Sequence, residues 1–271
     1  MGSLQIGSIG TRVRALQEAL RARGFNPGVP DGSFGPGTEA AVLAFQRSEG
    51  LLADGVVGPR TAAALDLMDV PPIPSVLPGV TVAIVAQMFP ATPIRNIEQH
   101  LPTVLEALVP AKLTEKSMVL MSLATIRAET AGFLPIDEGR SRYNTSPHGH
   151  PFDLYDNRRD LGNTGRPDGE RFCGRGFIQL TGRANYLKHG TAIGERDLVS
   201  HPERANDAAI AARLLAAFIK AHELPIKEAL LVNDLARARR LVNGGSHGIE
   251  QFASAFRAGQ RLIPEPIEIG A

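Results

Sequence analysis

Two acidic residues, Glu129 and Glu138, lie nine positions apart and precede a segment rich in glycine, amide and hydroxyl side chains. This segment, 174–186, reads Gly-Arg-Gly-Phe-Ile-Gln-Leu-Thr-Gly-Arg-Ala-Asn-Tyr. A pair of carboxyl groups suits glycosidic hydrolysis, in which one protonates the leaving oxygen and the other acts from the opposite side. Gln179 and Asn185 can each donate and accept hydrogen bonds, which suits an N-acetyl group or sugar hydroxyls. These residue types could serve the cleavage of an N-acetylated sugar polymer, and the alternatives are a structural ion pair for Glu129 and a solvated loop charge for Glu138.

Glu129 is predicted to lie near the end of a helix over about 115–130. Its inward face carries Val119, Ser122, Leu123 and Ile126. Glu129 continues that face, and a charged group on an apolar face is unfavourable unless it is paired or used. Two interpretations follow from spacing alone: a proton donor in a cleft, or a structural ion pair with Arg127 or Arg142.

An internal repeat organises the N-terminal part of the chain. The segment 31–38, Asp-Gly-Ser-Phe-Gly-Pro-Gly-Thr, returns 23 positions later as Asp-Gly-Val-Val-Gly-Pro-Arg-Thr in 54–61. In each copy Asp-Gly favours a turn, and proline is tolerated in the first turn of a helix. Apolar residues at helical spacing flank both copies. The repeat predicts a small helical domain over 4–66, in which two half-repeats share one core.

The remainder of the chain divides at a proline-rich stretch. Residues 67–80 contain four prolines, which predict an extended linker. From 81 to 271 the apolar spacing predicts a mainly α-helical domain. Its polar, turn-rich middle, 133–168, is where we expect a small strand or hairpin.

Composition narrows the possible functions. With 43% hydrophobic residues among 271, the chain can bury a core, and a net charge of +1 gives no reason to expect nucleic-acid binding. The single cysteine, Cys173, cannot form an intramolecular disulfide and is expected to be a reduced, packed thiol. We see neither a secretory signal nor a run long enough to span a membrane, so we expect no membrane insertion. We also expect a monomer.

Residues 4–66 resemble the peptidoglycan-binding module found beside many wall-degrading enzymes. The resemblance rests on Leu16-Gln17, Phe45-Gln46, Gly50-Leu51 and the repeated Asp-Gly turn. It implies that bacterial peptidoglycan is the ligand, held in a shallow groove. The alternative is a helical spacer that binds nothing.

The segment 173–186, with the Glu-Thr pair at 129–130, resembles the signature of the glycoside hydrolase family that contains plant-type chitinases and many phage endolysins. The family implies a fold of the lysozyme superfamily, an inverting mechanism and no metal or organic cofactor. By this resemblance Glu129 is the acid, although Ala128 stands where the family usually has His. Glu138 matches the second Glu of the phage-type branch and would activate a water held by Thr181.

The same resemblance implies sugar contacts from Gln179, Asn185 and Asn243, with a weaker match at Arg257. Tyr143 and Tyr186 are further candidates for sugar contact, and packing is the alternative for Tyr186. The rivals of Glu138 for the role of general base are Asp137, Asp153 and Asp156.

The attached module favours peptidoglycan over chitin as the substrate. We therefore expect an endolysin that hydrolyses the β-1,4 bond between N-acetylmuramic acid and N-acetylglucosamine. Such a protein would accumulate in the host cytoplasm and reach the wall when a holin opens the membrane. A lytic transglycosylase, in which Glu138 is unnecessary, and a chitinase stay open as alternatives.

Two alternatives come from other classes of protein. A zinc amidase or peptidase would need a metal site, and only His148 and His150, with Asp153 or Cys173, resemble one. No His-Glu-x-x-His spacing accompanies them. A non-catalytic wall-binding protein would leave the segment 174–186 without a role.

Overall fold

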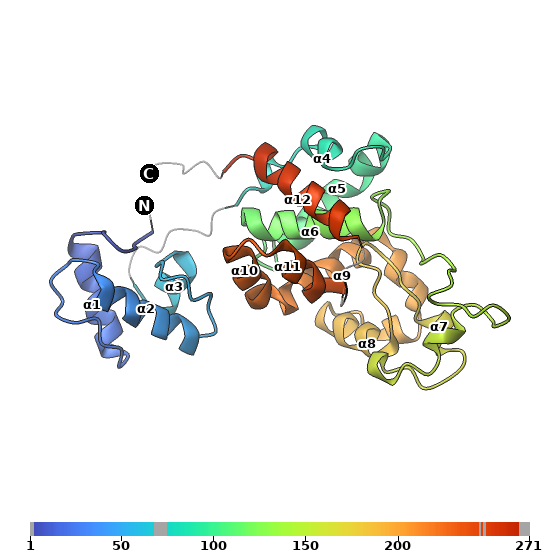
Figure 1. The fold of residues 1–271 in the computed structure, drawn as a ribbon, viewed down its shortest axis with the longest axis horizontal. Coiled ribbons are helices and arrows are strands. Elements are labelled where there is room, and N and C mark those ends of the chain that lie inside the picture. Colours follow the sequence, from blue (N-terminus) through green and yellow to red (C-terminus); the bar gives the residue numbers. More distant parts are fainter. Residues whose placement is uncertain (1–2, 68–74, 244, 246–247, 266–271) are drawn as a thin grey trace. The chain divides into compact units, whose positions relative to one another are not determined.

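The computed structural model describes residues 3–67, 75–243, 245 and 248–265 (Figure 1). Within these ranges the chain is mainly α-helical, as the sequence predicts. It forms two compact units, of which one contains residues 3–67 and Leu224–Asp234. The other contains residues 75–223 and 235–265. No helix in the described part of the chain is long and apolar enough to cross a membrane.

The N-terminal module consists of α1 (Thr11–Ala22), α2 (Pro36–Ser48) and α3 (Pro59–Ala64). Both α2 and α3 begin at the proline of the repeat, where the missing N–H does not interrupt the helix. Two antiparallel β-bridges, Leu4 with Val57 and Ile9 with Ser33, join the ends of the module. Its core is built from Leu16, Leu20, Phe34, Val42 and Phe45, all at most 1% exposed.

Two buried glutamines explain why the repeat contains Asp-Gly and Thr at fixed spacing. Gln17 and Gln46 each donate to an aspartate, a backbone carbonyl and a threonine, and each accepts from the glycine N–H of the turn. The partners of Gln17 are Asp31, Gly32, Ser33 and Thr38 at 2.9–3.1 Å. The partners of Gln46 are Asp54, Gly55, Val56 and Thr61 at 2.9–3.2 Å. Each glutamine therefore ties its own helix to the turn that starts the next one.

Replacing Gln46 by Ala is expected to destabilise the module by about 3 kcal/mol, because buried polar groups of the turn lose their partner. Scanning calorimetry of the full chain checks this through the transition of the module. Gln5→Ala is the control, since Gln5 is exposed and surface changes usually stay within about 0.5 kcal/mol. Equal transition temperatures for the two variants would contradict the role assigned to Gln46.

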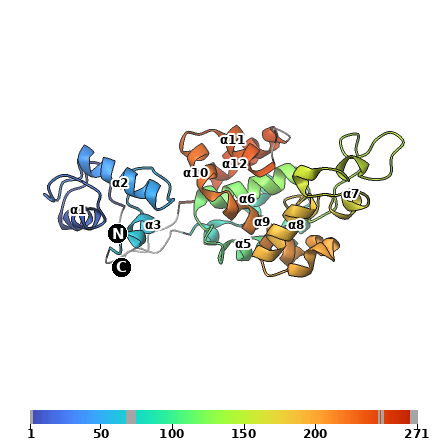
Figure 2. The same ribbon diagram turned by 90° about the horizontal axis from the view of Figure 1, so that it is seen from below.

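The second unit is organised around α6 (Lys116–Glu129), the helix predicted over 115–130. Every residue from Met118 to Ile126 in this helix is buried. Helices α9 (Ala208–Ala221) and α12 (Ile249–Leu262) pack on α6, as Figures 1 and 2 show. A Cβ at Gly259 of α12 would collide with Leu120 of α6, so glycine permits this close approach.

The other helices of this unit pack against one another and against α9 and α12. Helix α5 (Ile94–Leu108) packs against α9, and α4 (Val82–Met88) packs against α5 and α12. Helix α8 (Arg183–Ala192) also packs against α9, and α11 (Leu235–Asn243) packs against α12. Helix α7 (Asp168–Arg171) also belongs to this unit, whereas α10 (Glu223–Leu231) belongs, apart from Glu223, to the first unit.

The prediction of a strand or hairpin within 133–168 is wrong. The described chain there forms loops and short 3-10 helices, Asp153–Tyr155 and Arg159–Leu161. Short polar side chains accept hydrogen bonds from nearby N–H groups, as Asn144 does from Ser141, and so replace a partner strand. The β structure of this unit is an antiparallel bridge between Arg175 and Leu180.

The predicted linker, 67–80, falls largely on 68–74, which lie outside the described residues, so its boundaries stay a prediction. Residues 75–80 do pack, since Val76 and Val80 are 2% and 6% exposed. The N–H of Val76 donates to the carbonyl of Thr114 at 2.9 Å. The described end of this stretch therefore belongs to the second unit.

His189 of α8 is expected to make the second unit sensitive to acid. Burial, together with the charges of Lys188 and His222, lowers the pKa of His189 to about 4, against 6.5 for an exposed histidine. Between these values only the unfolded chain binds the proton, so stability falls as the pH drops from 6.5 toward 4. At 1.36 kcal/mol per unit the loss is at most about 3 kcal/mol. His189→Gln should flatten the dependence of the unfolding midpoint on pH, and an unchanged slope would contradict this.

Candidate functional site

Glu129 ends α6 and forms an ion pair with Arg239 of α11. The two side-chain atoms, Glu129 Oε1 and Arg239 Nη1, are 2.8 Å apart, and the side chains are 14% and 0% exposed. The expected partners were wrong: Arg127 lies over the ring of Phe89, and Arg142 contacts Tyr143. Glu129 is therefore held by a buried guanidinium on a different helix.

Arg239 is a site residue that sequence reasoning missed. It lies on the buried face of α11 together with Leu235, Ala238 and Val242. An arginine on an apolar helix face is rarely fully buried without a charged partner. An arginine among the apolar residues of this helix could therefore have predicted a buried ion pair with a carboxylate elsewhere in the chain.

Three donors converge on the carboxylate of Glu138. Asn144 Nδ2 and the Tyr155 hydroxyl both donate to Oε1 at 2.9 Å. The N–H of Gly174 donates to Oε2 at 3.1 Å. Burial and the neighbouring carboxylate raise the pKa of Tyr155, so its hydroxyl keeps its proton and stays a donor. The site thus holds Glu138 as a hydrogen-bond acceptor, which is the form a general base requires.

The segment 174–186 lies directly against the loop that carries Glu138. The N–H of Glu138 donates to the carbonyl of Gly174 at 2.7 Å. Because the N–H of Gly174 donates to the Glu138 carboxylate, two hydrogen bonds join these residues. Gln179 has a left-handed backbone, with φ of 51°, and its Nε2 donates to the carbonyls of Ile136 and Gly176 at 2.8 and 3.1 Å. The structure therefore brings Glu138 and Gln179 together.

Gly174→Ala is expected to lower activity about 100-fold. A Cβ at Gly174 would lie 2.9 Å from Gln179 Oε1 and 3.1 Å from Glu138 Oε2, so both side chains would have to move. Displacement of reacting groups by about 1 Å can reduce a rate by about 100-fold. Gly139→Ala is the matched control in the loop that carries Glu138, because nothing lies within 4 Å of its added Cβ. Similar rates of product release from the two variants would contradict this geometry.

Thr181 and Asn185 extend the same network toward α8. The hydroxyl of Thr181 donates to the carbonyl of Gln179 at 2.9 Å. Asn185 Nδ2 donates to the carbonyl of Thr181 at 2.8 Å. Both residues are partly exposed, so the Thr181 oxygen can still accept a hydrogen bond from water.

The prediction that Tyr186 contacts substrate does not hold in this structure. Its ring is 0% exposed and lies edge-on to Phe172. Its hydroxyl donates to the carbonyl of Cys173 and accepts from Arg175. An aromatic ring with a satisfied hydroxyl inside the core is a packing residue, the alternative that the sequence left open.

The other predicted sugar contacts are Tyr143, Asn243 and Arg257. Tyr143 is 72% exposed and stacks with Arg142, whose centre is 4.9 Å from the ring. Asn243 is the last residue of α11 and accepts from the N–H of Gly245 at 3.0 Å. Arg257 is exposed on α12. Their sugar contacts stay predictions.

The rival bases each have other partners. Asp137 pairs with Arg175 at 2.7 Å, and Asp156 pairs with His150 at 2.9 Å. Hydrogen bonds from Ser146 lower the pKa of Asp153 and fix its carboxylate in the loop. Each rival carboxylate is therefore engaged by a partner other than the donors that hold Glu138.

The structure also places the residues considered as metal ligands and the candidate nucleophile Cys173. In the described ranges, no group of three or more His, Cys, Asp or Glu side chains is placed to hold a metal. Cys173 is buried, and this burial raises its pKa to about 11. A thiol that keeps its proton at neutral pH is a poor nucleophile.

Comparisons with known proteins agree with the two-part organisation. Residues 9–65 match the family described as "Putative peptidoglycan binding domain". The zinc D-Ala-D-Ala carboxypeptidase of Streptomyces albus G is 49% identical over 65 residues, which are 22% of this chain and 24% of that protein. A glycosyl hydrolase family 19 domain-containing protein of Haemophilus influenzae is 31% identical over 106 residues, 39% of this chain and 49% of that protein. The chain thus spans half or less of these relatives.

Two solved structures align with the chain at low sequence identity. Chitinase C from Streptomyces griseus is 21% identical, with 68% of this chain and 92% of that chain covered and a TM-score of 0.49. The Burkholderia AP3 phage endolysin is 20% identical, with 96% and 100% covered and a TM-score of 0.27. In sequence, the chain combines a peptidoglycan-binding segment with similarity to a glycosyl hydrolase family 19 domain-containing protein.

Proposed function

We propose that the protein is a glycoside hydrolase that degrades bacterial peptidoglycan, cutting the β-1,4 bond between N-acetylmuramic acid and N-acetylglucosamine. The observation that carries this proposal is the carboxylate of Glu138. It accepts from Asn144, Tyr155 and Gly174 beside the amide of Gln179. Such an arrangement holds one carboxylate ready to accept a proton next to a group that can orient a sugar.

In the proposed mechanism Glu129 must first take up a proton in spite of its ion pair with Arg239, and it then gives that proton to the glycosidic oxygen as the bond to the anomeric carbon breaks. Glu138 takes a proton from water, and the water oxygen forms the new bond to that carbon. Thr181 accepts a hydrogen bond from the same water, and Gln179 and Asn185 orient the sugar. The product is inverted, and the two carboxyl groups would then stand about 6.5–9.5 Å apart to admit the water.

The buried ion pair gives Arg239 a part in the same mechanism. While Glu129 is ionised, the guanidinium balances its charge in a site with little solvent. When Glu129 has given up its proton to the leaving group, the same contact stabilises the carboxylate that is formed. Arg239 is thus a positioning residue that favours the product state of the acid.

Peptidoglycan is proposed as the partner because the N-terminal segment matches the peptidoglycan-binding family. Similar segments occur in proteins named for peptidoglycan chemistry, such as the N-acetylmuramoyl-L-alanine amidase CwlM of Mycobacterium tuberculosis, 45% identical over 56 residues. As part of the same proposal the protein acts as a monomeric endolysin, which reaches the wall from the cytoplasm after a holin opens the membrane.

The test compares purified peptidoglycan with chitin, each digested with and without a metal chelator, and follows new reducing sugar ends. The proposal expects reducing ends from peptidoglycan, far fewer from chitin, and no effect of the chelator. Faster release from chitin would make the protein a chitinase. Loss of activity with the chelator, together with released peptides and intact glycan, would replace the proposal with a metal-dependent amidase or peptidase.

A further inference from the structure

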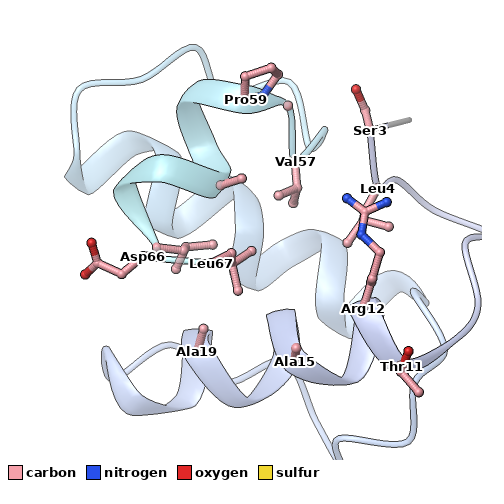
Figure 3. Close-up of a pocket in the computed structure, with 13 residues that line it drawn as sticks. Ser3, Leu4, Thr11, Arg12, Ala15, Ala19, Val57, Pro59, Asp66 and Leu67 are labelled. Carbon is pink, nitrogen blue, oxygen red and sulfur yellow. The ribbon is translucent and has the colours of Figure 1, made fainter. Parts of the chain in front are cut away.

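The N-terminal module contains a groove to which the sequence analysis assigned no residue. It lies between α1 and α3 and has a volume of about 410 Å³ (Figure 3). Leu4, Val57 and Leu65 are buried residues of its floor. Its size falls within the range of small-ligand sites, about 300–1,000 Å³. The groove is therefore large enough to be a binding site in its own right.

Three alanines are among the residues that line the groove. Ala15 and Ala19 belong to α1, and Ala62 belongs to α3. Among the described residues that line it, none is aromatic, so it offers no ring on which a sugar could stack. A surface of methyl groups is complementary to a ligand that itself carries methyl side chains, because both lose apolar area to water.

The groove has opposite charges at its two ends. In Figure 3 Arg12 extends beside Leu4 at one end, and Asp66 lies at the other. Asp66 also pairs with Arg23, and its side chain is still 82% exposed. A ligand that fits this pattern has a carboxylate near Arg12, a positive group near Asp66 and small apolar groups between them.

We propose that this groove binds the alanine-containing stem peptide of peptidoglycan rather than its glycan strand. The inference rests on the proposed function in so far as peptidoglycan is the partner. The methyl groups of the peptide pack against Ala15, Ala19 and Ala62, and its terminal carboxylate meets Arg12. The module would then hold the wall by its peptides and leave the glycan to the second unit.

The test measures binding of a synthetic stem tetrapeptide that ends in D-alanine to the full-length protein by calorimetry. Ala15→Phe is expected to weaken binding at least 10-fold, because Ala15 is exposed on the groove wall and a phenyl ring fills the space. Ala44→Phe is the matched control, an exposed alanine of α2 that does not line the groove. It should bind like the unmodified protein.

A second comparison locates the carboxylate. The wild type should bind the peptide acid more tightly than the peptide amide, and Arg12→Gln should remove that preference. Equal binding of the acid and the amide by the wild type would contradict the place given to Arg12. Binding of peptide-free glycan that Ala15→Phe abolishes would overturn the choice of the peptide.

Glycosidic cleavage of a short soluble glycan fragment, measured in parallel, separates this inference from the proposed function. The proposed catalytic residues lie outside the module, so Ala15→Phe should cleave the fragment at the wild-type rate. Cleavage without peptide binding would overturn the inference and leave the function in place. Peptide binding without cleavage would support the inference about the groove and contradict the proposed glycosidase function.

Discussion

Glu129→Gln should lower the rate of glycan cleavage by about 100- to 10,000-fold, the usual contribution of a positioned acid or base. The amide has nearly the shape of the acid but cannot give a proton to the leaving oxygen. Binding to peptidoglycan, measured by co-sedimentation, should be unchanged because the module is intact. The reducing ends released per minute from purified peptidoglycan check the prediction.

The same substitution should also reduce stability, and a second variant separates the two effects. Arg239 is fully buried, and removing one partner of a buried pair costs about 3–5 kcal/mol. Glu129→Gln combined with Arg239→Gln should recover part of this loss in thermal unfolding without recovering activity. If Glu129→Gln is folded and cleaves at the wild-type rate, the carboxylate serves only as the structural partner of Arg239.

Glu138→Gln is the second substitution with a large expected effect, again about 100- to 10,000-fold on hydrolysis. The amide keeps an oxygen that can accept from Asn144 and Tyr155, so the loop should stay in place. What is lost is the group that takes a proton from water. Initial rates on purified peptidoglycan, measured with matched protein concentrations, check the prediction.

The control for Glu138 is its neighbour. Asp137→Asn also removes one negative charge from the same loop, but Asp137 pairs with Arg175 and is 61% exposed in its side chain. Its activity should stay within a few-fold of wild type. If Asp137→Asn were the inactive variant and Glu138→Gln the active one, the assignment of the base would be wrong.

The parts that sequence reasoning predicted are those that depend on local pattern. The helix α6 follows from the apolar spacing of Val119, Leu123 and Ile126, which directs Glu129 inward at its end. The module follows from the repeat, since each Asp-Gly turn and each proline acts on its own neighbours. That Glu138 and Gln179 belong to one candidate site was predicted only through the family resemblance, because nothing local joins positions 41 residues apart.

The parts that were missed depend on contacts between distant segments. Arg239 lies 110 positions after Glu129, and several arginines nearer in the chain were equally reasonable partners. A tyrosine can stack on a sugar or pack in a core, and the sequence does not tell these two roles apart. The contacts of Tyr186 with Phe172 and Cys173 show that it packs in the core. The hairpin expected in 133–168 failed because local side chains satisfy the backbone there.

The measurement that tests the account most directly is mass spectrometry of the products released from purified peptidoglycan by wild type and by Glu129→Gln. The account predicts fragments that end in reducing N-acetylmuramic acid and that disappear with the variant. Anhydro ends would show that a sugar hydroxyl replaces water, and Glu138 would lose its role. Released peptides with intact glycan strands would contradict the glycosidase altogether.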